Sequence, residues 1–73
     1  MKQYITEPVY ENWATETAMP ELDPICYTIK VKGDGLNELG YPCVRLVLTV
    51  EEGDERTLRD TCEYLEEMEI TEL

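Results

Sequence analysis

Carboxylates dominate the reactive side chains of this chain, and the last ten residues, YLEEMEITEL, hold Glu66, Glu67, Glu69 and Glu72. If this segment closes a helix, these glutamates lie where the backbone carbonyls already concentrate partial negative charge. No Lys, Arg or His follows Arg59 to offset them. Such an arrangement costs stability, and positions that break a local rule are often functional. The C-terminal segment is therefore the first candidate site.

Catalysis by these carboxylates is disfavoured. The chain has no His, which removes the commonest general base and zinc ligand and excludes triads built on His. A carboxylate pair can perform acid and base chemistry, as in glycoside hydrolysis. A chain of 73 residues has little room, however, for the desolvated cleft that raises the pKa of one partner. The sequence predicts a non-enzymatic protein with no catalytic residue.

The sequence also contains no recognisable motif for a cofactor or a metal ion. The glycines of GDGLNELG match neither the dinucleotide-binding nor the phosphate-loop spacing, and they are typical of turns. The acids of EEGDE supply oxygen ligands, but without the spacing of a calcium-binding loop. Cys26, Cys43 and Cys62 are odd in number and form no C-x-x-C pair, which favours reduced, buried thiols. We expect no cofactor and no metal site.

Size and composition indicate a single small acidic domain over residues 1–73. Hydrophobic residues make up 42% of the chain, too many for a disordered acidic tail despite a net charge of -11. No run approaches the roughly 18 apolar residues of a membrane span, and MKQYITEPVY lacks the pattern of a secretory signal. We therefore expect a cytoplasmic protein, in the host cell cytoplasm if it is phage-encoded, that makes no membrane contact.

Charge is unevenly distributed along the chain. Seventeen acids against six basic residues make direct binding of nucleic acid or anionic lipid unfavourable, because such binding relies on Lys and Arg. Residues 24–50 carry a small positive excess, whereas residues 51–73 hold ten acids against Arg56 and Arg59. The last third of the chain therefore produces most of the negative field, and the expected partner is basic.

Two segments alternate apolar and polar residues with the period of a β-strand. They are residues 25–32, ICYTIKVK, and residues 43–50, CVRLVLTV, and we expect them to pair antiparallel. Between them, residues 33–42, GDGLNELGYP, form a longer connection than a tight hairpin needs, so a long loop is expected. The side chains expected to face the core are Ile25, Tyr27, Ile29, Val31, Val44, Leu46, Leu48 and Val50.

A helix is predicted after the second strand. Asp54 or Thr57 is a suitable cap for a helix that runs to about Met68. One stripe at spacings of three and four residues would cover the sheet, namely Leu58, Thr61, Cys62, Leu65 and Met68. In the first 24 residues, KQYIT is typical of a short edge strand, and ENWATETAMPELDP of an ordered loop around Trp13. The predicted fold is α+β: a small antiparallel sheet of two or three strands with one C-terminal helix packed on one face.

The outer face of that helix would collect acids about 5–6 Å from their near neighbours. Carboxylates held on a rigid scaffold can engage the Arg and Lys side chains with which other proteins bind phosphates. Trp13 is added to the candidates because Trp is frequent in binding hot spots. The candidate partner-binding residues are Glu51, Glu52, Asp54, Asp60, Glu63, Glu66, Glu67, Glu69 and Trp13.

These features predict an inhibitor or regulator that binds a basic protein surface, with a nucleic-acid mimic as the specific form. In size and composition alone, the chain resembles small acidic phage-encoded proteins that disable host restriction, CRISPR or repair enzymes. That resemblance implies an anti-restriction or anti-CRISPR role against a nucleic-acid-binding defence enzyme.

An alternative is a protein-interaction module or assembly subunit that binds through apolar contacts, with the acids serving solubility. Trp13, Tyr10, Tyr41 and the loop at 33–42 would then form the interface. The alternatives differ in their response to salt, because screening weakens a charged interface far more than an apolar one. The sequence predicts no particular oligomeric state.

Overall fold

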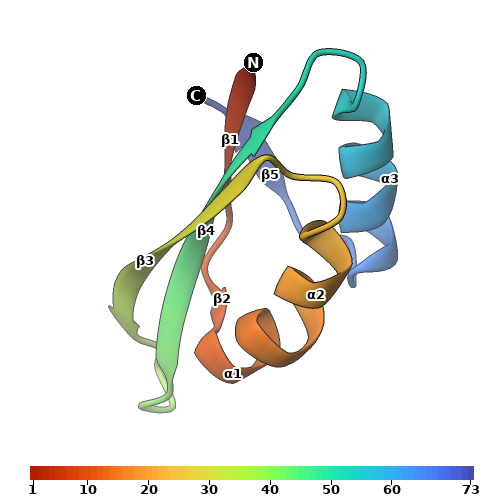
Figure 1. Ribbon diagram of the computed structural model, residues 1–73. Coiled ribbons are helices and arrows are strands. Elements are labelled where there is room, and N and C mark those ends of the chain that lie inside the picture. Colours follow the sequence, from red (N-terminus) through yellow and green to blue (C-terminus); the bar gives the residue numbers. More distant parts are fainter.

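The computed structural model describes all 73 residues and shows two layers, with the helices on one face of a single sheet (Figure 1). The strands are β1 (Lys2–Thr6), β2 (Val9–Tyr10), β3 (Thr28–Leu36), β4 (Pro42–Val50) and β5 (Ile70–Glu72). The helices are α1 (Glu11–Trp13), the π-helical η1 (Ala14–Ala18), α2 (Met19–Leu22) and α3 (Glu55–Tyr64). Because α1, η1 and α2 follow one another without a break, we call residues 11–22 the mid-chain helix.

Strand β4 is the centre of an entirely antiparallel sheet. It pairs with β3 on one side and with both β1 and β2 on the other, and β1 in turn pairs with β5. With β1 and β2 taken as one interrupted strand, the spatial order is β3, β4, β1–β2, β5 and the chain order is β-α-β-β-α-β. This is the split βαβ arrangement, in which each helix connects two strands that are parallel across an intervening one.

The predicted sheet of two or three strands with one helix is wrong, although the fold is α+β. The sheet has five strands, and there are two helical segments, one mid-chain and one C-terminal. The segment expected to be a loop around Trp13 is the mid-chain helix. Its apolar stripe, Ala14, Ala18 and Leu22, recurs every four residues and is fully buried. Two members of the stripe are small, so its hydrophobic pattern is weak in the sequence. The mid-chain helix therefore gains its stability mainly by packing.

Three other boundaries differ from the prediction. Segment KQYIT forms β1, but it lies between β4 and β5 and not at an edge. Strand β3 begins later than expected and continues to Leu36, so the loop is shorter than predicted, and Tyr27 and Val31 are exposed. Strand β5, which was not predicted, pairs with β1 alone.

The antiparallel β3–β4 pair and the alternation in β4 are confirmed. Val44, Leu46, Leu48 and Val50 are buried, each at most 2% exposed. The apolar stripe predicted for the C-terminal helix also faces the core, since four of its members are buried and Thr61 is half-buried. The core therefore lies between the sheet and both helical segments, and Tyr4 and Leu22 complete it.

The structure contains no helix with the length and apolar composition that a membrane span requires.

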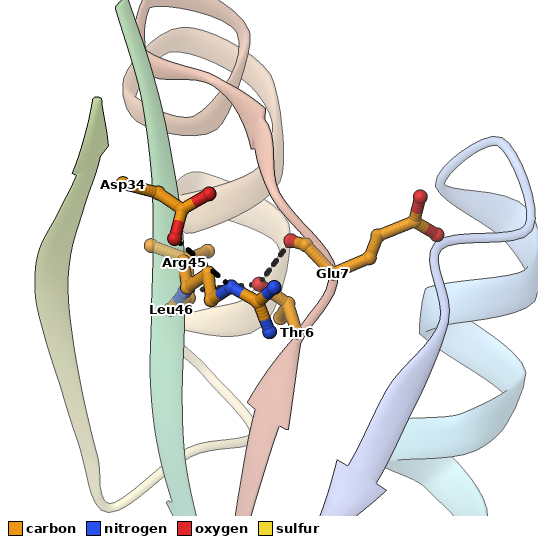
Figure 2. Close-up of polar contacts among 5 residues, drawn as sticks. All are labelled: Thr6, Glu7, Asp34, Arg45 and Leu46. Atoms are coloured by element: carbon orange, nitrogen blue, oxygen red, sulfur yellow. Dashed lines mark hydrogen bonds and ion pairs between the residues drawn. The ribbon is translucent and has the colours of Figure 1, made fainter. Parts of the chain in front are cut away.

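A bulge separates β1 from β2 along β4, and the Thr6 side chain provides a hydrogen bond that the bulge removes. Ile5 pairs with Val47 and Val9 with Val44, so the β1–β2 side has one extra residue relative to β4. The Leu46 N–H donates to Thr6 Oγ1 at 2.9 Å, and that hydroxyl donates to the Glu7 carbonyl at 2.9 Å (Figure 2). The hydroxyl thus satisfies a buried backbone donor that the bulge leaves without a carbonyl partner.

The two faces of the molecule differ in charge. The sheet face away from the helices carries Lys30, Lys32 and Arg45, which is half of the basic residues in the chain. Its acid is Asp34, whose carboxylate lies 3.2 Å from Arg45 Nε in an exposed ion pair (Figure 2). Most of the remaining acids lie on the helical layer or in its turns. The negative field is therefore concentrated on the helical side.

A candidate partner-binding surface around the C-terminal turn

Helix α3 ends at Tyr64, before the glutamates expected to continue it. The C-cap Leu65 leaves the helical region, and Glu66 and Glu67 follow with φ of 57° and 55°. These are left-handed conformations that glycine normally occupies. Glu66 and Glu67 therefore do not share a helical face with Asp60 and Glu63. We call residues 65–69 the C-terminal turn.

Backbone hydrogen bonds and two apolar side chains hold this turn. The Glu67 N–H donates to the Glu63 carbonyl at 3.0 Å, and the Met68 N–H donates to the Cys62 carbonyl at 3.0 Å. Leu65 and Met68 are both buried and anchor the turn to the core. The last carbonyls of α3 thus receive N–H donors from the turn itself, which lowers the cost of placing acids at this end.

Glycine at the strained positions should stabilise the protein. A left-handed conformation costs an L-residue about 1–2 kcal/mol, whereas the greater freedom of glycine in the unfolded chain costs about 0.4–1 kcal/mol. We expect Glu66→Gly or Glu67→Gly to raise the free energy of unfolding by about 0.5–1 kcal/mol each. Urea denaturation followed by circular dichroism measures the change. Glu66→Gln is the control, because it removes the charge and keeps the strain; an equal gain there would assign the effect to charge.

The first depression beside the turn is the α3–β5 groove, with a volume of about 540 Å³. Cys62, Met68 and Ile70 supply its apolar lining, and Glu63, Glu67 and Glu69 supply carboxylates. None of these three acids forms an ion pair. The groove therefore combines an apolar surface with three carboxylates and one cation, Arg59, so that its lining has a negative excess.

The nearby basic residue and backbone are already engaged. Arg59, which also lines the groove, has its guanidinium carbon 5.3 Å from the centre of the buried Tyr4 ring. On the opposite flank, the Glu69 N–H donates to Glu7 Oε2 at 2.6 Å, and the Glu7 N–H donates to the Glu69 carbonyl at 2.9 Å. Glu7 thus fixes the start of β5 and brings a further carboxylate to the turn, as its side chain in Figure 2 extends towards β5.

Two more depressions continue from the turn towards the mid-chain helix. The Trp13 groove, about 420 Å³, lies between β2 and the C-terminal turn and shares Met68 with the α3–β5 groove. The aromatic hollow, also about 420 Å³, shares Tyr10 and Trp13 with the Trp13 groove. Each depression therefore shares at least one lining residue with the next. The acids that line them are Glu7, Glu11, Glu63, Glu66, Glu67 and Glu69.

The structure divides the predicted site residues into separate groups. Glu63, Glu67 and Glu69 meet in the α3–β5 groove, and Glu66 meets Trp13 in the next one. Asp60 is exposed on α3 and lines neither groove. The exposed residues Glu51, Glu52 and Asp54 precede α3, and a helix of ten residues places them about 15 Å from the C-terminal turn.

Sequence reasoning missed Glu7 and Glu11. Each is an isolated acid in a segment without clear periodicity, so no local pattern distinguishes it. Only the pairing of β1 with β5, and of β2 with β4, brings them to the same surface as the C-terminal turn. The position of Glu7 just before Pro8, at a break in a strand, is the one available signal that its backbone has a special role.

The cysteines are free, and two of them are buried. Burial raises the pKa of both the Cys26 and Cys62 thiols to about 11, and Arg59 opposes this shift at Cys62. Cys62 therefore presents a neutral thiol to the α3–β5 groove at pH 7, and a neutral thiol is a poor nucleophile. Its role in the groove is to provide apolar surface. No group of three or more Cys, Asp or Glu side chains is arranged to hold a metal ion.

No family model, curated protein or solved structure matches this chain.

Proposed function

We propose that this protein is a non-enzymatic inhibitor or regulator that binds a basic protein surface. The observation that carries the proposal is the row of depressions around the C-terminal turn. Six carboxylates line this row, none of them forms an ion pair, and apolar side chains lie between them. We call this row the acidic trough.

The acidic trough matches the chemistry of Lys and Arg side chains. Each has an aliphatic stem and a charged end, so it gains most from apolar surface beside a carboxylate. In the α3–β5 groove, Met68 and Ile70 would contact the stem and Glu67 would pair with the charged end. A partner that presents several such side chains would satisfy the glutamates that this chain leaves unpaired.

Nucleic-acid-binding proteins are the partner class that we infer. They present rows of Lys and Arg to phosphates, and carboxylates along the acidic trough would occupy those side chains in place of phosphates. The specific form of the proposal is a nucleic-acid mimic of phage type that blocks a host defence enzyme. Charge separation between the helical layer and the open sheet face would orient the protein during association and raise its rate.

The test is capture of the partner with tagged protein from a host lysate, with elution in a salt gradient. In the turn variant, Glu63, Glu67 and Glu69 are all changed to Gln. We expect it to lose capture of a nucleic-acid-binding protein that the parent chain releases at moderate salt. Inhibition of that protein's nucleic-acid binding, titrated with both chains, should fall in parallel.

A matched control separates local from overall charge. The distal variant, Glu51→Gln, Glu52→Gln and Asp54→Asn, changes the net charge by the same amount at the opposite end of α3. We expect it to retain capture. Equal loss in both variants would assign binding to net charge alone, and unchanged capture by the turn variant would overturn the proposal.

A second candidate function follows from the aromatic hollow. Tyr10 and Tyr41 expose 48% and 58% of their surface, which suits an interaction module or assembly subunit whose partner covers aromatic side chains. In that case the acids serve solubility. Binding that persists at high salt and in the turn variant would favour this function over the first.

A further inference from the structure

The aromatic hollow places three aromatic residues from two distant parts of the chain around one depression. Tyr10 ends β2, Trp13 ends α1, and Tyr41 precedes β4. The Tyr10 and Tyr41 rings are 6.1 Å apart between centroids and nearly perpendicular, at 86°. The two rings therefore make an edge-to-face contact at the hollow, and Glu11, Asn12 and Pro42 complete the lining.

Trp13 is half-buried and packs against the core, but the core does not account for the exposed Tyr10 and Tyr41 rings. The buried tyrosine is Tyr4, whereas Tyr10 and Tyr41 leave about half of their surface in water. Large apolar surface that stays exposed contributes little to folding, and a cluster of it beside a hollow is typical of a binding site. A ligand that covers the ring faces would recover this surface.

The chemistry of the lining selects a cation. Aromatic ring faces carry partial negative charge and attract ammonium and guanidinium groups. Glu11 adds a carboxylate to the same hollow and has no ion-pair partner. The net charge of -11 further disfavours an anionic ligand.

Among cations, arginine satisfies every part of the lining. Its planar guanidinium stacks on aromatic faces and donates N–H groups to a carboxylate at the same time. A quaternary ammonium stacks but has no hydrogen to donate to Glu11. A lysine ammonium is more strongly hydrated and loses more on entering an aromatic site.

We infer that the aromatic hollow binds the guanidinium group of an arginine side chain on the partner. Tyr10, Trp13 and Tyr41 provide ring faces, and Glu11 accepts hydrogen bonds from the guanidinium. This inference rests on the proposed function, because the arginine belongs to the basic partner, and it adds a specific anchor at one end of the acidic trough.

The experiment uses small probes, so it requires no knowledge of the partner. N-acetyl-arginine amide is titrated into the full chain, and N-acetyl-citrulline amide serves as a neutral probe of nearly the same shape. Trp13 is the only Trp, so its fluorescence and its indole N–H resonance report on binding at the aromatic hollow or at the adjoining Trp13 groove. We expect saturable binding of the arginine probe in the millimolar range and at least tenfold weaker binding of the citrulline probe.

Variants assign the binding to the hollow. Tyr41→Leu and Glu11→Gln change exposed side chains and should each weaken arginine binding about fivefold or more, with unchanged circular dichroism. The turn variant should retain it within twofold. Equal weakening in the turn variant would show general attraction to acids and overturn the inference, as would equal affinity for citrulline. Tighter binding of N-acetyl-trimethyllysine amide would overturn the assignment to arginine.

The two proposals fail in different ways. If the probe does not bind but partner capture still depends on the turn glutamates, the hollow is not an arginine site and the proposed function stands. If the probe binds as expected but the turn variant captures the partner normally, the proposed function fails and the arginine site stands.

Discussion

Changing Leu22 to Ala should lower the free energy of unfolding by about 2–5 kcal/mol, the range for removing a large aliphatic side chain from a packed core. Leu22 lies in α2 and is fully buried. A domain of 73 residues is expected to have a total stability of only about 4–11 kcal/mol, at roughly 0.05–0.15 kcal/mol per residue. The variant should therefore be close to the limit of folding at 37 °C.

Urea denaturation followed by circular dichroism measures this effect. Leu39→Ala is the matched control, because Leu39 is 74% exposed in the turn before β4, and we expect a change within about 0.5 kcal/mol. The comparison tests the mid-chain helix directly. A loop in this segment would leave Leu22 with few contacts, so equal and small effects in the two variants would contradict the helical layer.

The contrast between α3 and the mid-chain helix explains which part of the fold could be predicted. The segment of α3 and the C-terminal turn has an apolar stripe with Leu58, Leu65 and Met68 opposite a charged face, and this periodicity is visible in sequence. The mid-chain helix relies on Ala14 and Ala18, which permit close approach to the sheet but carry little hydrophobic signal. Pro20 also interrupts the pattern, because it has no N–H to donate to an i−4 carbonyl; in the structure it lies inside the mid-chain helix, just after the π-helical η1.

Strand β4 was predictable for a related reason. One of its faces is fully buried and the other is mostly half-buried, so its sequence alternates. Strand β5 is only three residues long and partly exposed, so it has no comparable pattern. It forms because the C-terminal turn directs the chain back along β1, and Glu7 holds Glu69, the residue before β5, through hydrogen bonds.

The candidate site was predictable in composition but not in geometry. An excess of acids after residue 50 is evident from the sequence, and three of these acids line the groove beside the end of α3. The left-handed backbone at Glu66 and Glu67 has no sequence marker, because glycine or asparagine is the usual residue there. The buried side chains of Leu65 and Met68 anchor the turn and hold the strained backbone between them. This backbone conformation reverses the chain so that Glu67 and Glu69 reach the α3–β5 groove.

Changing Thr6 to Val should lower the free energy of unfolding by about 1–3 kcal/mol, the cost of leaving a buried backbone donor unsatisfied. Valine has nearly the same shape as threonine, so the loss arises from the hydroxyl and not from packing. Thr6 is 1% exposed, and its hydroxyl is the acceptor for the Leu46 N–H at the bulge. A water molecule has little room to replace the hydroxyl at a site this buried.

Hydrogen exchange at the Leu46 amide gives a local measurement beside the global one. We expect this amide to exchange faster in Thr6→Val than the change in global stability alone explains, because its hydrogen bond is lost. Thr6→Ser keeps the hydroxyl and removes a methyl group, so it should protect Leu46 more than Thr6→Val does. If Thr6→Val unfolds with the same free energy as the parent chain, the hydroxyl does not stabilise the bulge. The joining of β1 and β2 along β4, which brings Glu7 and Tyr10 to the acidic trough, would then require another cause.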